Sequence, residues 1–253
     1  AYHRLGLFQG GWCLPAAAAV LSDAILGTGE VLDTIGRLVE RSMVGVERGA
    51  ATRYRMLDTL RQYAAERLLA TGEHDAISQR HAEYFRDVVR DAESHLRGHA
   101  QRETFHQLRE EQPNIRAALA WLSGPGGDLD SALETAGALG LFWHLVRHLE
   151  GRELLSRLLE SGNGSPHARA RALQAASLVE RPRACLVHPS PRCAETARES
   201  LTIFEDLGDD SRAALSRVLL AVEGVTGQNP DGAKDLLRSA DAQFAADGDA
   251  WGE

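Results

Sequence analysis

The chain has 253 residues, of which 43% are hydrophobic and 25% are charged, and its formal net charge is −8. This length allows a sizeable core and two domains, and the composition is ordinary for a folded protein. The acidic balance excludes a protein that binds nucleic acid through its overall charge. Three cysteines are too few, and odd in number, for a disulfide framework, so they predict a reducing, cytoplasmic location.

The two ends of the chain predict that it is a fragment of a longer protein. The sequence lacks an initial Met and opens within an apolar segment, AYHRLGLFQGGW, that has no signal-peptide pattern. It stops at DGDAWGE, where another helix could begin. The sequence contains no apolar run of about 18 residues or more, so we expect no membrane partner.

The N-terminal part predicts a helix, a hairpin and a second helix. Pro15 favours the start of a first short helix over 15–22. From Val31, apolar residues recur at helical spacing, and the runs 43–47 and 52–57 then alternate around the turn RGAA. Asp58 or Thr59 is predicted to cap the next helix, which ends near Gly72. This order is typical of a winged-helix domain, which we place at 1–74.

The rest of the chain predicts helices only. Gly98 interrupts them, and Pro113 is predicted to start a new helix. The segment SGPGGD (123–128) is the clearest break and separates a helical linker, 75–123, from a helical region, 124–253. That region begins with a predicted helix pair, 129–145 and 149–159.

Two segments in the helical region are similar to each other. CAETARESLTIFEDLGDD (193–210) and AKDLLRSADAQFAADGDA (233–250) align at an offset of 40 residues, which pairs Phe204 with Phe244, Gly208 with Gly248 and Asp209 with Asp249. A repeat of this period predicts stacked helix pairs in an α-solenoid. The intervening segment RPRACLVHPSPR (181–192) holds three prolines and predicts a rigid loop. The predicted fold class is therefore mainly α, with one small β-hairpin.

Several segments carry a resemblance to a known family. They are RLGLFQGGWCLPAAAAVLSD, VLDTIGRLVERSMV, TRYRMLDTLRQYAAERLLATGE, RHAEYFRDVV and NIRAALAWLSG. Together they resemble large bacterial transcriptional regulators with a STAND-type ATPase, of the LuxR type and of the antibiotic-regulatory type common in actinomycetes. The resemblance implies a P-loop ATPase before this region, a winged helix, tetratricopeptide (TPR)-like repeats and a DNA-binding domain elsewhere.

The resemblance also implies a contact surface. Related ATPases carry a Met-His-Asp motif whose His faces bound ADP, and the matching residues here are Met56, Leu57 and Asp58. Leu57 cannot donate a hydrogen bond to a phosphate. We therefore expect Arg55, Leu57, Asp58 and Arg61 to form an interdomain contact with an upstream NTPase domain of the same protein.

A second predicted site lies on the repeats. Trp121, Phe142 and Trp143 either line a groove for a ligand or partner, with Arg147 and Arg152 beside it, or pack in the core. The groove would take an unknown protein or small-molecule inducer.

Cofactors, metals and catalysis are not expected. The chain has no G-x-x-x-x-G-K-[ST], so it cannot bind a nucleotide in the P-loop manner. His144 and His148, and Cys185, His188 and Cys193, lack the ligand number and spacing of a metal site. No Ser-His-Asp or Cys-His arrangement has supporting context, so we expect no enzyme.

The predicted function is regulatory. The repeats would bind an inducer or protein and pass the signal through the winged helix to the NTPase, and DNA would be bound only by another domain. The alternatives are a standalone TPR-like scaffold and a DNA-binding winged helix with a helical dimerisation region. Residues 37–67 carry seven arginines against four acidic residues, a local net charge of +3, which is modest for a phosphate-binding surface.

Overall fold

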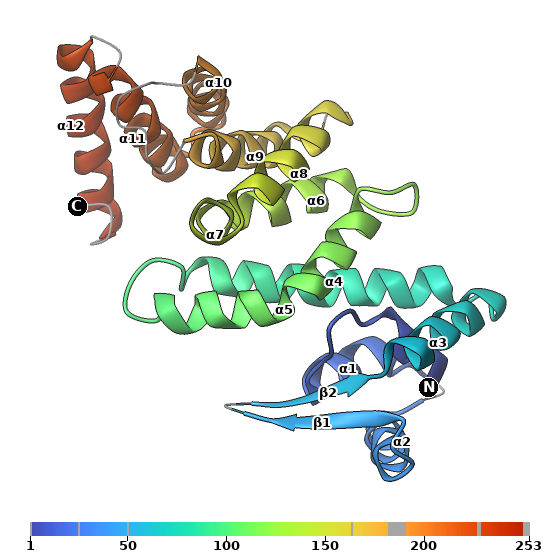
Figure 1. Ribbon diagram of the computed structural model, residues 1–253. Helices are drawn as coiled ribbons and strands as arrows, with labels where there is room; N and C mark the ends of the chain where they lie inside the picture. Colours follow the sequence, from blue (N-terminus) through green and yellow to red (C-terminus); the bar gives the residue numbers. More distant parts are fainter. Residues whose placement is uncertain are drawn as a thin grey trace. The chain divides into compact units, whose positions relative to one another are not determined.

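The computed structural model describes residues 2–24, 26–49, 51–162, 164–181, 191–226 and 229–249. The described chain is mainly α-helical with one two-stranded antiparallel sheet (Figure 1), which confirms the predicted fold class. It divides into two compact units: unit 1 comprises 1–89 and 106–127, and unit 2 comprises 90–105 and 128–253. These units group residues by contact, so the predicted division into three functional parts stays a prediction.

Unit 1 holds the hairpin and the helices around it. In chain order its elements are η1 (Tyr2–Leu7), α1 (Leu14–Leu21), α2 (Thr28–Glu40), β1 (Val44–Arg48), β2 (Thr52–Met56), α3 (Asp58–Ala70), most of α4 (His74–Glu93) and most of α5 (Gln101–Leu122). The turn between α4 and α5 belongs to unit 2. Both helices therefore contribute residues to each unit.

The hairpin lies where the sequence predicts it. Val44 pairs with Met56, and both side chains are buried. Trp12 extends the sheet by an isolated bridge to Tyr54, with N–O distances of 2.9 and 2.8 Å between their backbones. Val46 is 37% exposed, so only the end of the hairpin near α3 packs in the core.

An aromatic cluster forms part of the unit 1 core. The ring of Phe8 lies 5.4 Å from Trp12, 5.3 Å from His81 and 6.3 Å from Phe85, measured between centroids. All four side chains are at most 3% exposed. The N-terminal segment is thereby held against α4 by apolar burial, which is the dominant favourable term in folding.

Unit 2 consists of helices in succession. They are α6 (Leu129–Ala138), α7 (Gly140–Val146), α8 (His148–Glu160), α9 (Pro166–Val179), α10 (Pro191–Leu207), α11 (Asp210–Thr226) and α12 (Pro230–Asp247). From α9 to α12 each helix packs on the next one along the chain (Figure 1). This succession is typical of helical repeats.

The predicted 40-residue offset has a structural counterpart. Phe204 and Phe244 are both buried, and α10 and α12 each end before a left-handed glycine, Gly208 with φ 70° and Gly248 with φ 68°. In both copies the amide of the following aspartate donates to the phenylalanine carbonyl at 2.9 Å. The two segments thus share a glycine-capped helix end.

Three local predictions were wrong. Pro113 lies inside α5 and does not start a helix; the helix loses one hydrogen bond there, but buried Leu108 and Ile115 hold both sides of it. The helix predicted over 129–145 breaks at Leu139 into α6 and α7. Neither Asp58 nor Thr59 caps α3, because Leu57 occupies the N-cap position without a side-chain bond.

Residues 182–190 of the predicted loop 181–192 lie outside the described residues. The prediction was wrong for Pro191 and Arg192, which form the start of α10.

Candidate functional site

The predicted interdomain contact is a surface at the junction of β2 and α3. Leu57 is 63% exposed, and Arg55 is also exposed and lies 3.1 Å from Glu47, between Nε and Oε1. Arg61 is half-buried and lies 3.6 Å from Asp58, which is almost fully exposed. The four residues are therefore close in the fold and accessible, as a contact would require.

The residues predicted to line a groove separate into two groups. Phe142 and Trp143 are 1% exposed and pack in the core of unit 2, which was the alternative role for them. Arg147 and Arg152 are exposed on the same unit, at the start of α8. Trp121 belongs to unit 1, where it is half-buried. The role of these residues in ligand binding stays a prediction.

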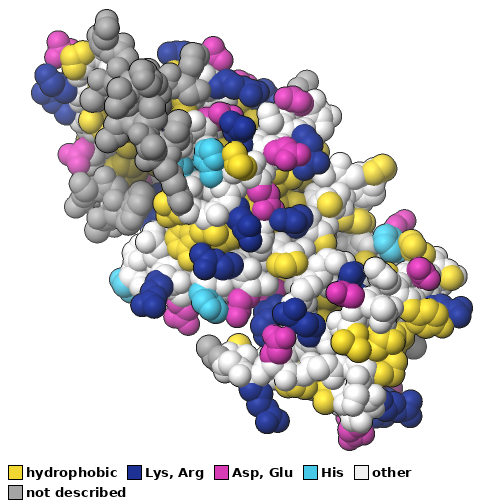
Figure 2. Space-filling model, viewed as in Figure 1, with side chains coloured by type: hydrophobic (Ala, Val, Ile, Leu, Met, Phe, Trp, Pro, Cys, Tyr) yellow, Lys and Arg dark blue, Asp and Glu magenta, His cyan; other side chains and the backbone are white. Residues whose placement is uncertain are grey.

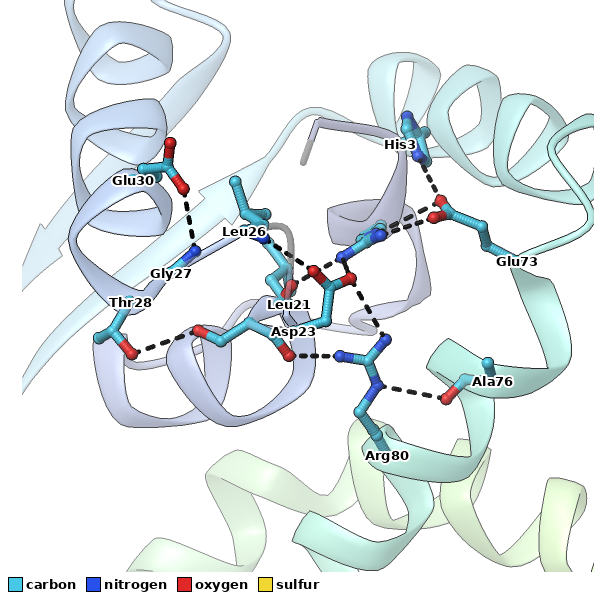
Figure 3. Close-up of polar contacts among 12 residues, drawn as sticks. His3, Leu21, Asp23, Leu26, Gly27, Thr28, Glu30, Glu73, Ala76 and Arg80 are labelled. Carbon is cyan, nitrogen blue, oxygen red and sulfur yellow. Dashed lines mark hydrogen bonds and ion pairs between the residues drawn. The ribbon is translucent and has the colours of Figure 1, made fainter.

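A charged network, which we call the Arg4 network, fixes the N-terminal segment in unit 1. The Arg4 guanidinium donates to Asp23 at 2.6 Å, to Glu73 at 2.6 Å and to the Leu21 carbonyl at 2.8 Å. Arg4 is 7% exposed. Figure 3 shows Glu73 and Asp23 reaching toward one point, with Arg80 approaching Asp23.

The electrostatics of the Arg4 network favour its charged form. The hydrogen bond from Arg4, aided by one with His3, lowers the pKa of Glu73 to about 2. The same bond raises the pKa of Arg4. Arg4 therefore meets Asp23 across 19 residues of sequence and Glu73 across 69 residues. No local pattern in the sequence indicates a contact of this range, which is why the Arg4 network was missed.

A second polar cluster connects the hairpin to α5. Arg53 on β2 donates to both carboxylate oxygens of Glu111. Burial disfavours the charged form of Arg53, but the hydrogen bonds and charge of Glu111 outweigh it and raise its pKa. Fully buried Asn114 donates to the Gly11 carbonyl at 2.9 Å and accepts from the Gln9 amide at 2.7 Å. These contacts hold the hairpin, the N-terminal segment and α5 in one geometry.

Unit 2 contains a cavity of about 470 Å³. Its lining comes from the end of α4 and the turn after it, from α9, from the start of α11 and from the end of α12. The residues are Glu93, Ser94, Arg97, Gln174, Asp209, Ser211, Arg212, Leu215, Phe244, Asp247 and Asp249. We call this the repeat cavity. Its size is within the range of small-molecule sites.

The charges of the repeat cavity are mostly paired. Glu93 accepts from Arg171 and lies 3.6 Å from Arg212, and Asp209 lies 3.6 Å from Arg212. Burial lowers the pKa of Arg212, and the neighbouring charge of Arg171 lowers it further. Arg97 faces Asp249 at 3.8 Å. The sequence repeat pointed to Phe244 and Asp249, but not to the α4 side of the cavity.

The charges on the face seen in Figure 2 do not form a single basic patch. There, dark blue Lys and Arg side chains are interspersed with magenta Asp and Glu among the described residues. A nucleic-acid footprint normally gathers cations on one face or stripe.

The metal-site alternatives find no support in the described residues. No group of three or more His, Cys, Asp or Glu there could hold a metal ion. Cys193 is buried, with its thiol 2.9 Å from the Ser177 carbonyl. Cys185 and His188 lie outside the described residues.

No described helix is long and apolar enough to cross a bilayer.

The chain is similar to named proteins over nearly its whole length. It is 32% identical over 257 aligned residues to proteins named "Putative HTH-type transcriptional regulator" from Mycobacterium bovis and Mycobacterium tuberculosis. The match covers 99% of this chain. This chain is related in sequence to part of a transcriptional regulator. It spans 29% of the length of those relatives.

Other comparisons add less. An uncharacterised Mycobacterium tuberculosis protein is 39% identical over 87 residues, which cover 33% of this chain and 22% of that protein. No protein-family model matches the chain, and no solved structure matches it.

Proposed function

We propose that this chain is the sensor and coupling region of a multidomain transcriptional regulator with a STAND-type ATPase. TPR-like repeats in unit 2 bind a ligand or protein, and the winged helix in unit 1 transmits the event to an upstream NTPase domain. The observation that carries the proposal is the 32% identity over 99% of the chain to proteins named as HTH-type regulators. DNA is bound by a domain outside this chain.

Two features of the structure support this division of roles. The repeat cavity provides unit 2 with a space for a ligand. Its α4 side belongs to a helix that continues into unit 1, where His81 and Phe85 pack in the core. Occupancy of the cavity therefore acts on a helix shared by both units. Such coupling requires the ligand to bind one conformation more tightly than the other.

The proposed output surface is the β2–α3 junction. It exposes one large apolar side chain, Leu57, between the arginines Arg55 and Arg61. A surface of this kind suits packing against another domain, since apolar contact adds stability and flanking charges fix the register. The proposal predicts that the gene encodes a P-loop before this region.

The test uses the full-length regulator and a transcriptional reporter. Charge reversal by Arg55→Glu or Arg61→Glu should change basal or induced output several-fold and leave the protein folded. Arg67→Glu is the matched control, because Arg67 is an exposed arginine at the other end of α3. Unchanged output in both test variants would contradict the coupling role, and so would a gene without a P-loop.

A further inference from the structure

The repeat cavity has one acidic group that the surrounding cations do not neutralise. Its lining carries four carboxylates and two guanidinium groups, a net charge of −2. Glu93, Asp209 and Asp249 each lie within 4 Å of an arginine nitrogen. Asp247 accepts a hydrogen bond at 2.9 Å from neutral Gln243, and no described cation pairs with it. The surplus negative charge is therefore at the end of α12.

The backbone around Asp247 adds to this negative charge. Asp247 is the last residue of α12, where the unsatisfied carbonyl groups carry the negative end of the helix dipole. An acidic side chain at this end is unfavourable for the helix by itself, because cations are preferred there. A positive group bound beside Asp247 would remove this conflict.

A second polar group in the cavity has unused hydrogen-bonding capacity. Gln174 is 7% exposed, and its Nε2 donates to the Arg212 carbonyl at 2.9 Å and to Ser216 Oγ at 2.8 Å. A backbone carbonyl can only accept, which fixes the orientation of the amide. The Gln174 Oε1 accepts no hydrogen bond from the described residues. Gln174 Oε1 is not fully buried, so it is an accessible acceptor in the lining of the cavity and is available to an N–H group of a ligand.

The rest of the lining consists of two serines, Ser94 and Ser211, and two apolar side chains. Leu215 and Phe244 line the cavity beside these acceptors, and Phe244 presents an aromatic ring. Such a ring attracts a cation electrostatically and an alkyl chain by burial. A carboxylate, an amide oxygen and an aromatic face together match a group with several N–H donors, a positive charge and a hydrocarbon stem.

We propose that the repeat cavity binds an organic amine, with its ammonium group between Asp247 and Gln174 and its alkyl stem on Phe244 and Leu215. This assignment rests on the proposed sensor function and gives the chemical class of the inducer. The ligand also contacts the α4 side of the cavity, so its binding biases the helix that continues into unit 1.

The experiment is calorimetric titration of the whole chain with 1,6-diaminohexane, and with hexanedioate as a dianion of matched length. The diamine should bind in the millimolar range or tighter, and the dianion should not. Asp247→Asn should weaken diamine binding about fivefold or more, since it removes the unpaired charge. Asp241→Asn, an exposed aspartate on α12 outside the cavity lining, should leave it unchanged.

Three results would overturn the assignment: absence of diamine binding, equal binding of hexanedioate, or an equal effect of both substitutions. Circular dichroism of each variant separates loss of binding from loss of folding. A failed titration with an altered reporter in Arg55→Glu would overturn only the amine assignment. Diamine binding with an unaltered reporter would overturn only the proposed coupling.

Discussion

The Arg4 network and the repeat cavity are both rich in charge, but they differ in how the charges are used. In the Arg4 network the guanidinium is buried and meets two carboxylates and a carbonyl. In the repeat cavity the Asp247 carboxylate has no described cation beside it and the Gln174 amide oxygen accepts no hydrogen bond from the described residues, and there is space beside them. From this difference we infer that charges paired with one another stabilise the fold. A carboxylate without a cation and an acceptor without a donor, both beside a cavity, are instead available to bind a ligand.

The largest expected effect comes from breaking the Arg4 network. Arg4→Met leaves Asp23 and Glu73 without their shared cation, so we expect a loss of about 3 kcal/mol in the free energy of unfolding. Urea denaturation followed by tryptophan fluorescence measures it. Arg238→Met is the control, because Arg238 forms an exposed pair with Asp235 and should cost less than about 0.5 kcal/mol. Similar losses in both variants would contradict a structural role for the network.

A comparable effect is expected from acid, through buried His81. Burial lowers the pKa of His81 to about 4 from 6.5. Between pH 6.5 and 4 the unfolded chain binds a proton at His81 and the folded chain does not. The free energy of unfolding is therefore unaffected by His81 above pH 6.5 and decreases as the pH falls toward 4. The loss is roughly 3 kcal/mol over this window.

Glu73 makes the stability of the fold depend on pH in a separate, lower range. Its pKa of about 2, against 4.5 when unperturbed, means that its contribution is complete above pH 4.5 and is lost as the pH falls toward 2. His81→Phe should therefore remove the pH dependence between 6.5 and 4 and keep the lower one. Urea unfolding at a series of pH values separates the two. An unchanged upper window in His81→Phe would contradict the assignment to His81.

A smaller effect is expected at glycine-capped helix ends, and it should be alike in the two units. Gly72 and Gly208 have φ values of 72° and 70°, and an added Cβ would meet nothing within 4 Å. Replacement by Ala costs only backbone strain, about 1 kcal/mol at each position. Gly36→Ala in α2 has equal space and no positive φ, so it should stabilise the chain by about 0.5 to 1 kcal/mol. Destabilisation by Gly36→Ala would contradict this account.

The smallest effect on stability should come from the cavity itself. Asp247→Asn removes a charge that no described cation pairs with, at an exposed helix end, so the unfolding free energy should change by less than about 0.5 kcal/mol. Thermal unfolding measures it. A loss as large as that of Arg4→Met would mean that Asp247 is a structural residue like those of the Arg4 network.

The sequence predicted the features that depend on neighbouring residues. The hairpin follows from alternation in 43–47 and 52–57, and the glycine-capped ends follow from the repeat that aligns Gly208 with Gly248. Pro113 was assigned wrongly, because the burial of Leu108 and Ile115 on both sides of it outweighed its local preference. Tertiary context commonly does this.

The candidate sites were predicted less well. Arg4, Glu73 and Asp23 are brought together by folding over long sequence separations, which single-sequence periodicity does not contain. Phe142 and Trp143 have the residue types of a groove, but they are buried in the core. The repeat cavity combines the turn after α4 with α12, so its membership could not be inferred from the repeat alone.

Hydrogen exchange of the whole chain with saturating 1,6-diaminohexane tests most directly whether unit 2 is the binding unit. Protection should increase in 93–97 and around the end of α12, and the segment around Arg4 should keep its exchange rates, because its polar groups are already paired. Increased protection around Arg4, or none at the end of α12, would contradict the account.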